Sequence, residues 1–254
     1  MTRDEILAAS AMPPAAPSYG PGPYRHTDRA VLAIDYETDA DAVHAALPAP
    51  LEPDGAVVTV SFIDVPASDF GAYGACVIAL AATLDGAPVA YYHALYTAQE
   101  APLFGGREIW GFPCLRGEAD LIHGENRVTG TLDLGYGRVI RASTPVQPEG
   151  DDAARAAARA AIARTRICCK LVPDAAGGPA IAQLIAVAPD AVSVKGCWHG
   201  AGELESGPDG PLAGFPVVRL IAGRYTLADL TLPYGRVVHD YLANGFSNGL
   251  ADGA

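Results

Sequence analysis

Few residues in this sequence can act as covalent nucleophiles. Of the 17 basic side chains, 15 are arginines and only two are lysines, Lys170 and Lys195. A mechanism that needs an amine nucleophile therefore has two side-chain candidates besides the N-terminus. Lys195 lies in an alternating segment, 192–197, which predicts a solvated strand face. Lys170 is expected to pair with a carboxylate at a strand end, because lysine is seldom buried unpaired.

The thiols form no recognisable metal site. The five cysteines are odd in number and contain no Cys-x-x-Cys pair: Cys76, Cys114, Cys168, Cys169 and Cys197. Structural zinc sites usually show such paired spacing, so we expect no metal and free thiols in a reducing compartment. Cys168 and Cys169 are adjacent on a predicted strand and should point to opposite faces, which indicates packing rather than redox chemistry.

The common catalytic and nucleotide-binding motifs are missing. There is no Gly-x-Ser-x-Gly, no His-Glu-x-x-His and no glycine-rich phosphate loop that follows a strand. Gly105 and Gly106 lie in a predicted loop without the strand–turn–helix context of a dinucleotide site. The sequence therefore predicts no cofactor.

Composition restricts the class of protein. Half of the 254 residues are hydrophobic and 18% are charged, which excludes a disordered chain, and a length of this kind favours one large domain. The formal net charge of −12 makes a nucleic acid an unfavourable partner. The sequence has no apolar run long enough to span a membrane, and Met1 to Glu5 lack the order of a signal peptide. We expect a soluble, cytoplasmic protein.

The elements that must position these residues are mostly strands. Residues 1–23 are rich in proline, alanine and glycine and predict an extended arm that either moves freely or lies on a neighbouring subunit. Residues 24–254 are expected to form a single domain. Its predicted strands are 31–34, 56–63, 77–84, 88–96, 116–122, 127–133, 138–142, 180–188, 191–198, 216–221 and 235–242.

Two helices and one tight turn complete this prediction. The segment 38–41 resembles a cap before a short helix that ends at Pro48, and alanine-rich 151–164 predicts a long helix. Asp85-Gly86 predicts a tight hairpin turn. The fold class is α+β, dominated by antiparallel strands, and a barrel is expected at this strand count.

One segment resembles a known family. Gly106-Arg107-Glu108-Ile109-Trp110-Gly111-Phe112-Pro113 is similar to the Gly-Arg-Glu loop and aromatic-Pro pair of the acetoacetate decarboxylase family. Further matches follow in the family's order: 24–39 with Arg29, 47–53, 130–133, 170–174, 198–200 and 227–229. This resemblance implies an acetoacetate-decarboxylase-like, cone-shaped β-barrel with peripheral helices, one enclosed pocket and a homo-oligomer.

The sequence departs from the family at the catalytic positions. The resemblance implies a Schiff-base lysine and a second lysine directly after the aromatic-Pro pair, where a neighbouring cation lowers the pKa of the amine. Here these positions are Cys114 and Leu115, and the two acidic pocket positions are Ser61 and Ala75. Only Arg29 remains of the set. A thiol cannot form the iminium that accepts the carbanion left by carbon dioxide, so Schiff-base decarboxylation is not expected.

The remaining candidates would act without a covalent intermediate. Arg29 is the expected anchor for a carboxylate or carbonyl, with a structural salt bridge as the alternative. Ser61, Tyr92 and His93 are candidate proton-transfer groups, although His93 also fits a core position. Substrate contacts are expected from Arg29, Trp110, Phe112 and Leu115.

Cys114 is either a nucleophile or a buried thiol that lines the pocket. Arg107 and Glu108 are expected to form an ion pair.

Three functions are therefore compatible with the sequence. The first is a lyase, hydratase or cyclase that acts on a small oxo- or carboxyl-bearing compound by acid–base and electrostatic catalysis. The second is a hydrolase or transferase that uses Cys114 covalently. The third is a small-molecule-binding protein that has kept the pocket and lost catalysis.

Overall fold

Long, alternating strands build one large sheet in the computed structural model, which describes residues 1–146 and 149–243. The strand order is β12-β14-β1-β2-β4-β5-β10-β11-β15, and all neighbours except β5 and β10 are antiparallel. Two short strands lie off this path: β3 (Ala67–Ser68) pairs with β1, and β6 (Cys114–Arg116) pairs in parallel with β5. The main strands are β1 (Tyr24–Glu37), β2 (Glu52–Val65), β4 (Tyr73–Leu84), β5 (Ala87–Thr97), β10 (Arg166–Pro173), β11 (Pro179–Val187), β12 (Asp190–Gly200), β14 (Arg219–Leu232) and β15 (Arg236–Asp240).

A second sheet of four strands packs on one face of the first. Its order is β13 (Glu203–Ser206), β9 (Arg138–Pro145), β8 (Arg127–Asp133) and β7 (Glu118–His123). The core between the sheets holds fully buried side chains such as Phe62, Leu132 and Ile140. Gly130 permits this close approach, because a Cβ atom there would lie 2.2 Å from the Phe62 ring.

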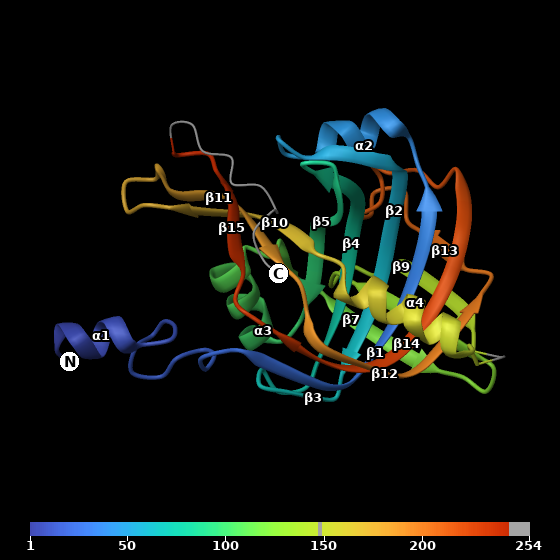
Figure 1. Cartoon of the computed structure of the whole chain (residues 1–254), viewed down its shortest axis with the longest axis horizontal. Helices are drawn as coiled ribbons and strands as arrows, with labels where there is room; N and C mark the ends of the chain where they lie inside the picture. Colours follow the sequence, from blue (N-terminus) through green and yellow to red (C-terminus); the bar gives the residue numbers. More distant parts are fainter. Residues whose placement is uncertain (147–148, 244–254) are drawn as a thin grey trace.

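The helices lie at the periphery: α1 (Arg3–Ala8), α2 (Ala40–Ala46), α3 (Glu100–Gly105), the π-helical turn η1 (Gly106–Trp110) and α4 (Asp152–Ala163). Helix α4 begins after Asp151, whose side chain accepts a hydrogen bond from the backbone N–H of Ala154. It crosses the face of the large sheet that the second sheet leaves open (Figure 1). Among the described residues, no helix has the length and apolar character that crossing a membrane requires.

The α+β, mostly antiparallel prediction is confirmed, and so are both predicted helices and the hairpin at Asp85-Gly86. Both turn residues have positive φ, as a tight two-residue turn requires. The predicted barrel is not closed, since the sheet ends at β12 and β15 within the described residues. The strand predicted at 216–221 was wrong in extent. Strand β14 (Arg219–Leu232) starts later and continues further, and Arg224, Thr226 and Asp229 hide this continuation because they interrupt the apolar pattern of the sequence.

The arm is only partly extended. Residues 3–8 form α1, capped by Thr2, and the arm projects from the body of the protein (Figure 1). Tyr19 ties it to η1 by donating a hydrogen bond of 2.7 Å to the carboxylate of Glu108. The division at residue 23 stays a prediction, and residues 244–254 of the predicted domain lie outside the described residues.

Candidate active site

Strand alternation gives the large sheet a second, concave face that encloses a cavity. On β1, Leu32, Ile34 and Tyr36 pack into the core between the sheets. The intervening residues point the other way and line the cavity: Arg29, Val31, Ala33 and Asp35. Strands β2 and β4 follow the same rule, so that one sheet supplies both a packed core and a cavity wall.

The cavity has two adjoining chambers of different size and character. The smaller has a volume of about 70 Å³ and is walled largely by the aromatic residues Phe70, Trp110 and Phe112. The larger, of about 420 Å³, lies between the concave face and α4. Arg29, Tyr92 and Arg166 line both chambers, and they therefore mark the boundary between them.

A bulge in β1 brings two functional side chains to the same chamber. His26 and Arg29 are three residues apart and would face opposite sides of a regular strand. The register shifts between them, and Asp28 takes a left-handed φ of 54°. The bulge is held by a hydrogen bond of 2.8 Å from the Asp28 N–H to Asp229 and by Lys195, whose Nζ lies 2.6 Å from both carboxylates.

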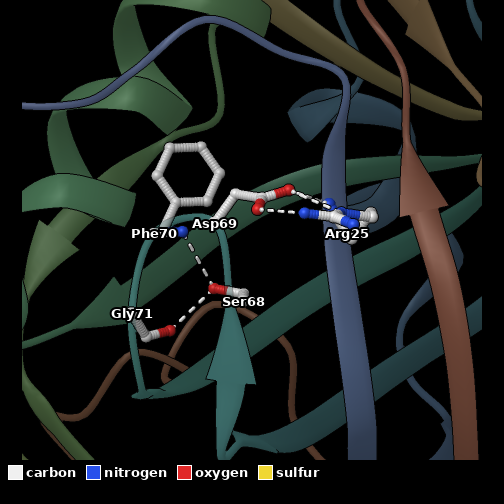
Figure 2. A network of polar contacts seen from close by, with 5 residues as sticks. All are labelled: Arg25, Ser68, Asp69, Phe70 and Gly71. Atoms are coloured by element: carbon white, nitrogen blue, oxygen red, sulfur yellow. Dashed lines mark hydrogen bonds and ion pairs between the residues drawn. The ribbon is translucent and has the colours of Figure 1, made fainter.

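The smaller chamber's wall is fixed by a tight turn after β3. Ser68 donates a hydrogen bond of 2.7 Å to the Gly71 carbonyl and accepts one of 3.1 Å from the Phe70 N–H. Asp69 accepts a hydrogen bond of 2.7 Å from the Arg25 N–H and forms an ion pair with its guanidinium (Figure 2). Phe70 is thereby held against β1, where it stacks on Tyr24 at a centroid distance of 4.2 Å.

Arg29 and Arg166 carry positive charge that no carboxylate of the described residues neutralises. Arg166 donates through Nε to the Tyr92 hydroxyl at 2.7 Å and through Nη1 to the Arg164 carbonyl at 3.1 Å. The side chain of Arg29 makes no hydrogen bond or ion pair with the described part of the chain. Burial lowers the pKa of Arg29, and so does repulsion from Arg166. Both observations indicate a site that lacks its anion, because a buried charge requires a partner.

The only acid that lines either chamber, among the described residues, is already paired. Asp35 accepts a bidentate contact from Arg224 and a hydrogen bond of 2.8 Å from Thr59. Its side chain is 15% exposed and that of Arg224 is 28% exposed. This end of the larger chamber is therefore electrically satisfied without a ligand.

A histidine–tyrosine couple lies beside Arg29. His26 Nε2 and the Tyr73 hydroxyl are 2.9 Å apart, and both residues line the smaller chamber. Burial, together with the Arg29 charge, lowers the pKa of His26 to about 4, so the ring is neutral at pH 7. Burial raises the pKa of Tyr73 to about 12, although the charge of Arg29 opposes the shift. A neutral imidazole that is hydrogen-bonded to a phenol can pass a proton to or from a ligand.

The predicted site residues divide by position. Arg29, Tyr92, Trp110 and Phe112 line the smaller chamber, as does Ala75, and Ser61 lines the larger one. His93 lies outside both chambers. It is the residue displaced by the β4–β5 register shift, and its ring packs edge-on against Phe215 at 5.0 Å. The structure therefore gives no support for its predicted role in proton transfer.

Cys114 and Leu115 do not line the cavity either. The Cys114 side chain is 1% exposed and packs behind Gly106, and burial raises the pKa of the thiol to about 12. Such a thiol is neutral and shielded, which argues against a nucleophile. Leu115 is 50% exposed because it points away from the packed side of β6. Its predicted contact with substrate stays a prediction, and Leu115 does not line either chamber.

Neither lysine reaches the chambers. Lys195 lies on an exposed strand face, as predicted, and supports the β1 bulge through two ion pairs. Lys170 donates a hydrogen bond of 3.1 Å to the Ile109 carbonyl at the end of η1, not to the expected carboxylate. The expected ion pair between Arg107 and Glu108 does not form. Arg107 instead donates a hydrogen bond to the Cys114 carbonyl, and Glu108 accepts one from the Tyr19 hydroxyl.

Three site residues were missed by sequence reasoning: His26, Tyr73 and Arg166. His26 was hidden by the bulge, since its spacing from Arg29 indicates opposite faces. Arg166 had a detectable signal, because it precedes the buried pair Ile167 and Cys168 at the start of β10. Tyr73 had none, as a tyrosine at a strand start is usually packing.

A curved, mostly antiparallel sheet with Arg29 and Arg166 in the wall of a cavity is typical of a small-molecule-binding site, and sequence comparison gives the family. The family model described as acetoacetate decarboxylase matches residues 11–242. This chain belongs to the acetoacetate decarboxylase family.

Individual relatives agree over nearly the whole length. The acetoacetate decarboxylase of Chromobacterium violaceum is 36% identical, over 92% of this chain and 96% of that protein. A solved acetoacetate decarboxylase superposes with a TM-score of 0.90 at 29% identity, covering 96% of this chain and 100% of the other. The acetoacetate decarboxylase structure from Legionella pneumophila gives 0.86 at 32% identity, with coverages of 94% and 96%.

Proposed function

We propose that this protein is an enzyme that binds a small oxo- or carboxyl-bearing compound and acts on it by non-covalent acid–base and electrostatic catalysis, as a lyase, hydratase or cyclase. The observation that carries this proposal is the unneutralised pair Arg29 and Arg166 at the boundary between the two chambers. A carboxylate can accept forked hydrogen bonds from such guanidinium groups. Family membership supports an enzyme, and the cavity chemistry supports a different intermediate from that of a Schiff-base decarboxylase.

The cavity residues take separate roles in this proposal. Arg29 and Arg166 hold the carboxylate, and Tyr92 is fixed by Arg166 with its hydroxyl at the same boundary. Tyr73, coupled to neutral His26, donates a hydrogen bond to the carbonyl oxygen on which charge develops and exchanges a proton with the ligand. Ser61 is a further hydroxyl in the larger chamber. Trp110 and Phe112 stack at 5.1 Å and keep the smaller chamber apolar.

The placement of the amines supports a mechanism without a Schiff base. Neither Lys170 nor Lys195 lines a chamber, and the thiol of Cys114 is buried behind Gly106. Incubation with acetoacetate and borohydride, followed by intact mass spectrometry, should give no adduct. A stoichiometric reduced adduct on either lysine would contradict the proposal.

Turnover tests the proton-transfer roles. A panel of 2-oxo and 3-oxo acids is followed by proton NMR with the wild type, Tyr73→Phe, His26→Asn and, as a matched control, Tyr241→Phe. We expect the first two variants to lose about 10²- to 10⁴-fold in rate, the usual contribution of a general acid–base group. Unchanged rates in Tyr73→Phe and His26→Asn would remove the couple from the mechanism.

A binding protein is the second candidate. The observation that favours it is the absence of acids around the arginine pair, with Ser61 and Ala75 at the positions where the family resemblance implies carboxylates. Tight binding of an oxo acid without any turnover across the panel would establish this alternative.

A homo-oligomer in the cytoplasm also stays part of the proposal. The arm exposes the apolar side chains of Ile6 and Leu7, at 50% and 67%, which suits contact with another subunit. Light scattering of the full chain and of a chain that lacks residues 1–18 gives the test, with a loss of assembly expected for the shorter one.

A further inference from the structure

The smaller chamber cannot hold the whole of a sizeable ligand. Its volume of about 70 Å³ is a sixth of the neighbouring 420 Å³, and only the latter falls within the range of typical ligand pockets, about 300–1,000 Å³. The two arginines lie where the chambers meet. A ligand anchored there has its free space in the larger chamber, beneath α4.

Small apolar side chains make up the larger part of the wall of the larger chamber, and the hydroxyl groups of Thr59, Ser61 and Thr226 interrupt it. Strand residues contribute Val31, Ala33, Val57 and Ala79, and α4 contributes Ala157 and Ala161. Larger residues at these positions would close the space between sheet and helix, as they do between the two sheets. Where methyl groups line this wall, methylene and methyl groups of a ligand are favoured, because polar atoms would find no hydrogen-bond partner on those side chains.

The charged side chains of this chamber gather toward two ends, with Arg29, Arg166 and the neighbouring Arg164 at one and Asp35 with Arg224 at the other. Arg29 and Asp35 are six residues apart on one strand face, which is roughly 20 Å at the usual rise of a strand. At the Asp35 end the carboxylate and Arg224 neutralise each other. A second anion on the ligand would therefore meet Asp35 and an already paired arginine, whereas a neutral, apolar end meets no penalty.

We propose that the ligand is an elongated monocarboxylate, whose acid group binds Arg29 and Arg166 and whose unbranched apolar chain extends along the concave face of β1 and β2 beneath α4. This inference rests on the proposed function, since it assumes that the arginine pair holds a carboxylate. It adds the substrate class, which is an oxo acid with a chain well beyond four carbons.

Affinities of non-reacting straight-chain acids test the chain directly. Butanoate, hexanoate and octanoate are titrated calorimetrically at equal ionic strength, each below its micelle concentration. We expect the affinity to rise about fourfold per added methylene, which is the transfer free energy of a CH₂ group expressed as an affinity ratio. The dicarboxylate of eight carbons should bind at least tenfold more weakly than octanoate.

Chamber-filling variants locate the chain. Ala33→Leu and Ala79→Leu each add bulk to the cavity face rather than to the core between the sheets. Two variants are used so that the test still stands if one of them misfolds. Ala160→Leu, on the exposed side of α4 and outside the chamber lining, is the matched control. The two chamber-filling variants should bind butanoate with the affinity of the wild type, but their affinity should no longer rise from butanoate to octanoate. In the control variant the affinity should rise as it does in the wild type.

The outcomes separate the two proposals. If butanoate binds and longer acids bind no better, the elongated chain is wrong and the arginine site stands. If chain length matters equally in the filled variants, the chain lies elsewhere and the inference is also wrong. If no acid binds at any length, the proposed function itself fails. If the eight-carbon dicarboxylate binds as tightly as octanoate, the prediction that the far end of the ligand is neutral is wrong.

Discussion

Two arginine sites on the same concave face of this protein have opposite electrostatic environments. Arg224 is paired with Asp35, which Thr59 also supports, so that end of the larger chamber is complete in the protein alone. Arg29 and Arg166 have no carboxylate within the described residues, and burial together with repulsion from Arg166 lowers the pKa of Arg29. The difference teaches that burial of an arginine is not by itself evidence of a ligand site. The lack of a counter-charge beside the arginine is the evidence for such a site.

The largest expected effect comes from removing each type of arginine. The double variant Arg29→Met, Arg166→Met should weaken binding of a short oxo acid by roughly 10²- to 10⁴-fold, since each charged hydrogen bond contributes about 1.5–3 kcal/mol. Arg224→Met should change that affinity by less than about threefold. Titration calorimetry with 2-oxobutanoate measures both.

The thermal stabilities of the same variants should change in opposite directions. Replacing Arg29 and Arg166 removes uncompensated buried charge, and the ligand-free protein should melt at the same temperature or higher. Arg224→Met leaves Asp35 partly buried without its cation and should destabilise by about 1–3 kcal/mol. An early-melting double variant with intact affinity would make the pair a structural feature, and the contrast between the two ends would disappear.

A pH dependence sharpens the comparison at the unneutralised end. His26 has a folded-state pKa of about 4, below the ordinary value of 6.5, because of burial and the Arg29 charge. Between these values the unfolded chain binds a proton that the folded protein does not. The free energy of unfolding should therefore fall as the pH drops from about 6.5 to about 4, by up to about 3 kcal/mol.

Denaturant unfolding of the wild type and His26→Asn at pH 7, 5.5 and 4 checks this expectation. The variant should lose part of the acid sensitivity. His93, whose pKa is also lowered by burial, acts with the same sign, so His93→Asn serves as the comparison outside the cavity. Equal acid sensitivity of wild type and His26→Asn would contradict the placement of His26 as a buried neutral base.

A smaller effect is expected from the support of the β1 bulge. Lys195→Met removes both ion pairs that hold Asp28 and Asp229, leaving the Asp28 N–H bonded to Asp229. Lys195 acts as a positioning residue, and kcat should fall by about tenfold or less while KM for the substrate changes little. A loss of stability with kcat unchanged would show that the ion pairs stabilise the fold without orienting His26 and Arg29.

The smallest change is expected from restoring the family lysines. Cys114→Lys, Leu115→Lys should give little decarboxylation of acetoacetate, since position 115 points to solvent and no acid of the described residues lies beside the arginine pair. Adding Ser61→Glu and Ala75→Glu should raise the rate. Carbon dioxide release by the double variant, the quadruple variant and the wild type gives the measurement. Efficient turnover by the lysine variant alone would mean that only the nucleophile is missing.

Sequence reasoning predicted the elements with strong local signals. The hairpin at Asp85-Gly86, helix α4 and the aromatic wall of Trp110 and Phe112 all follow from short-range patterns. Gly105 and Gly106 were expected to lie in a loop, yet they belong to α3 and η1, where close packing requires Gly106.

What could not be predicted depends on three-dimensional placement. His26 faces the cavity only because β1 has a bulge, and Cys114 avoids it only because its side chain packs behind Gly106. The electrostatic state of Arg29 likewise depends on which carboxylates fold toward it. None of these is a property of local sequence.

The central claim is that Arg29 and Arg166 bind the carboxylate of a small ligand, and the most direct test compares an acid with its ester. Titration of 2-oxobutanoate and its methyl ester into the wild type should show the acid binding at least tenfold more tightly. In Arg29→Met, Arg166→Met this preference should disappear, because the charge that distinguishes acid from ester is gone. Equal binding of acid and ester by the wild type, or an unchanged preference in the double variant, would contradict the account.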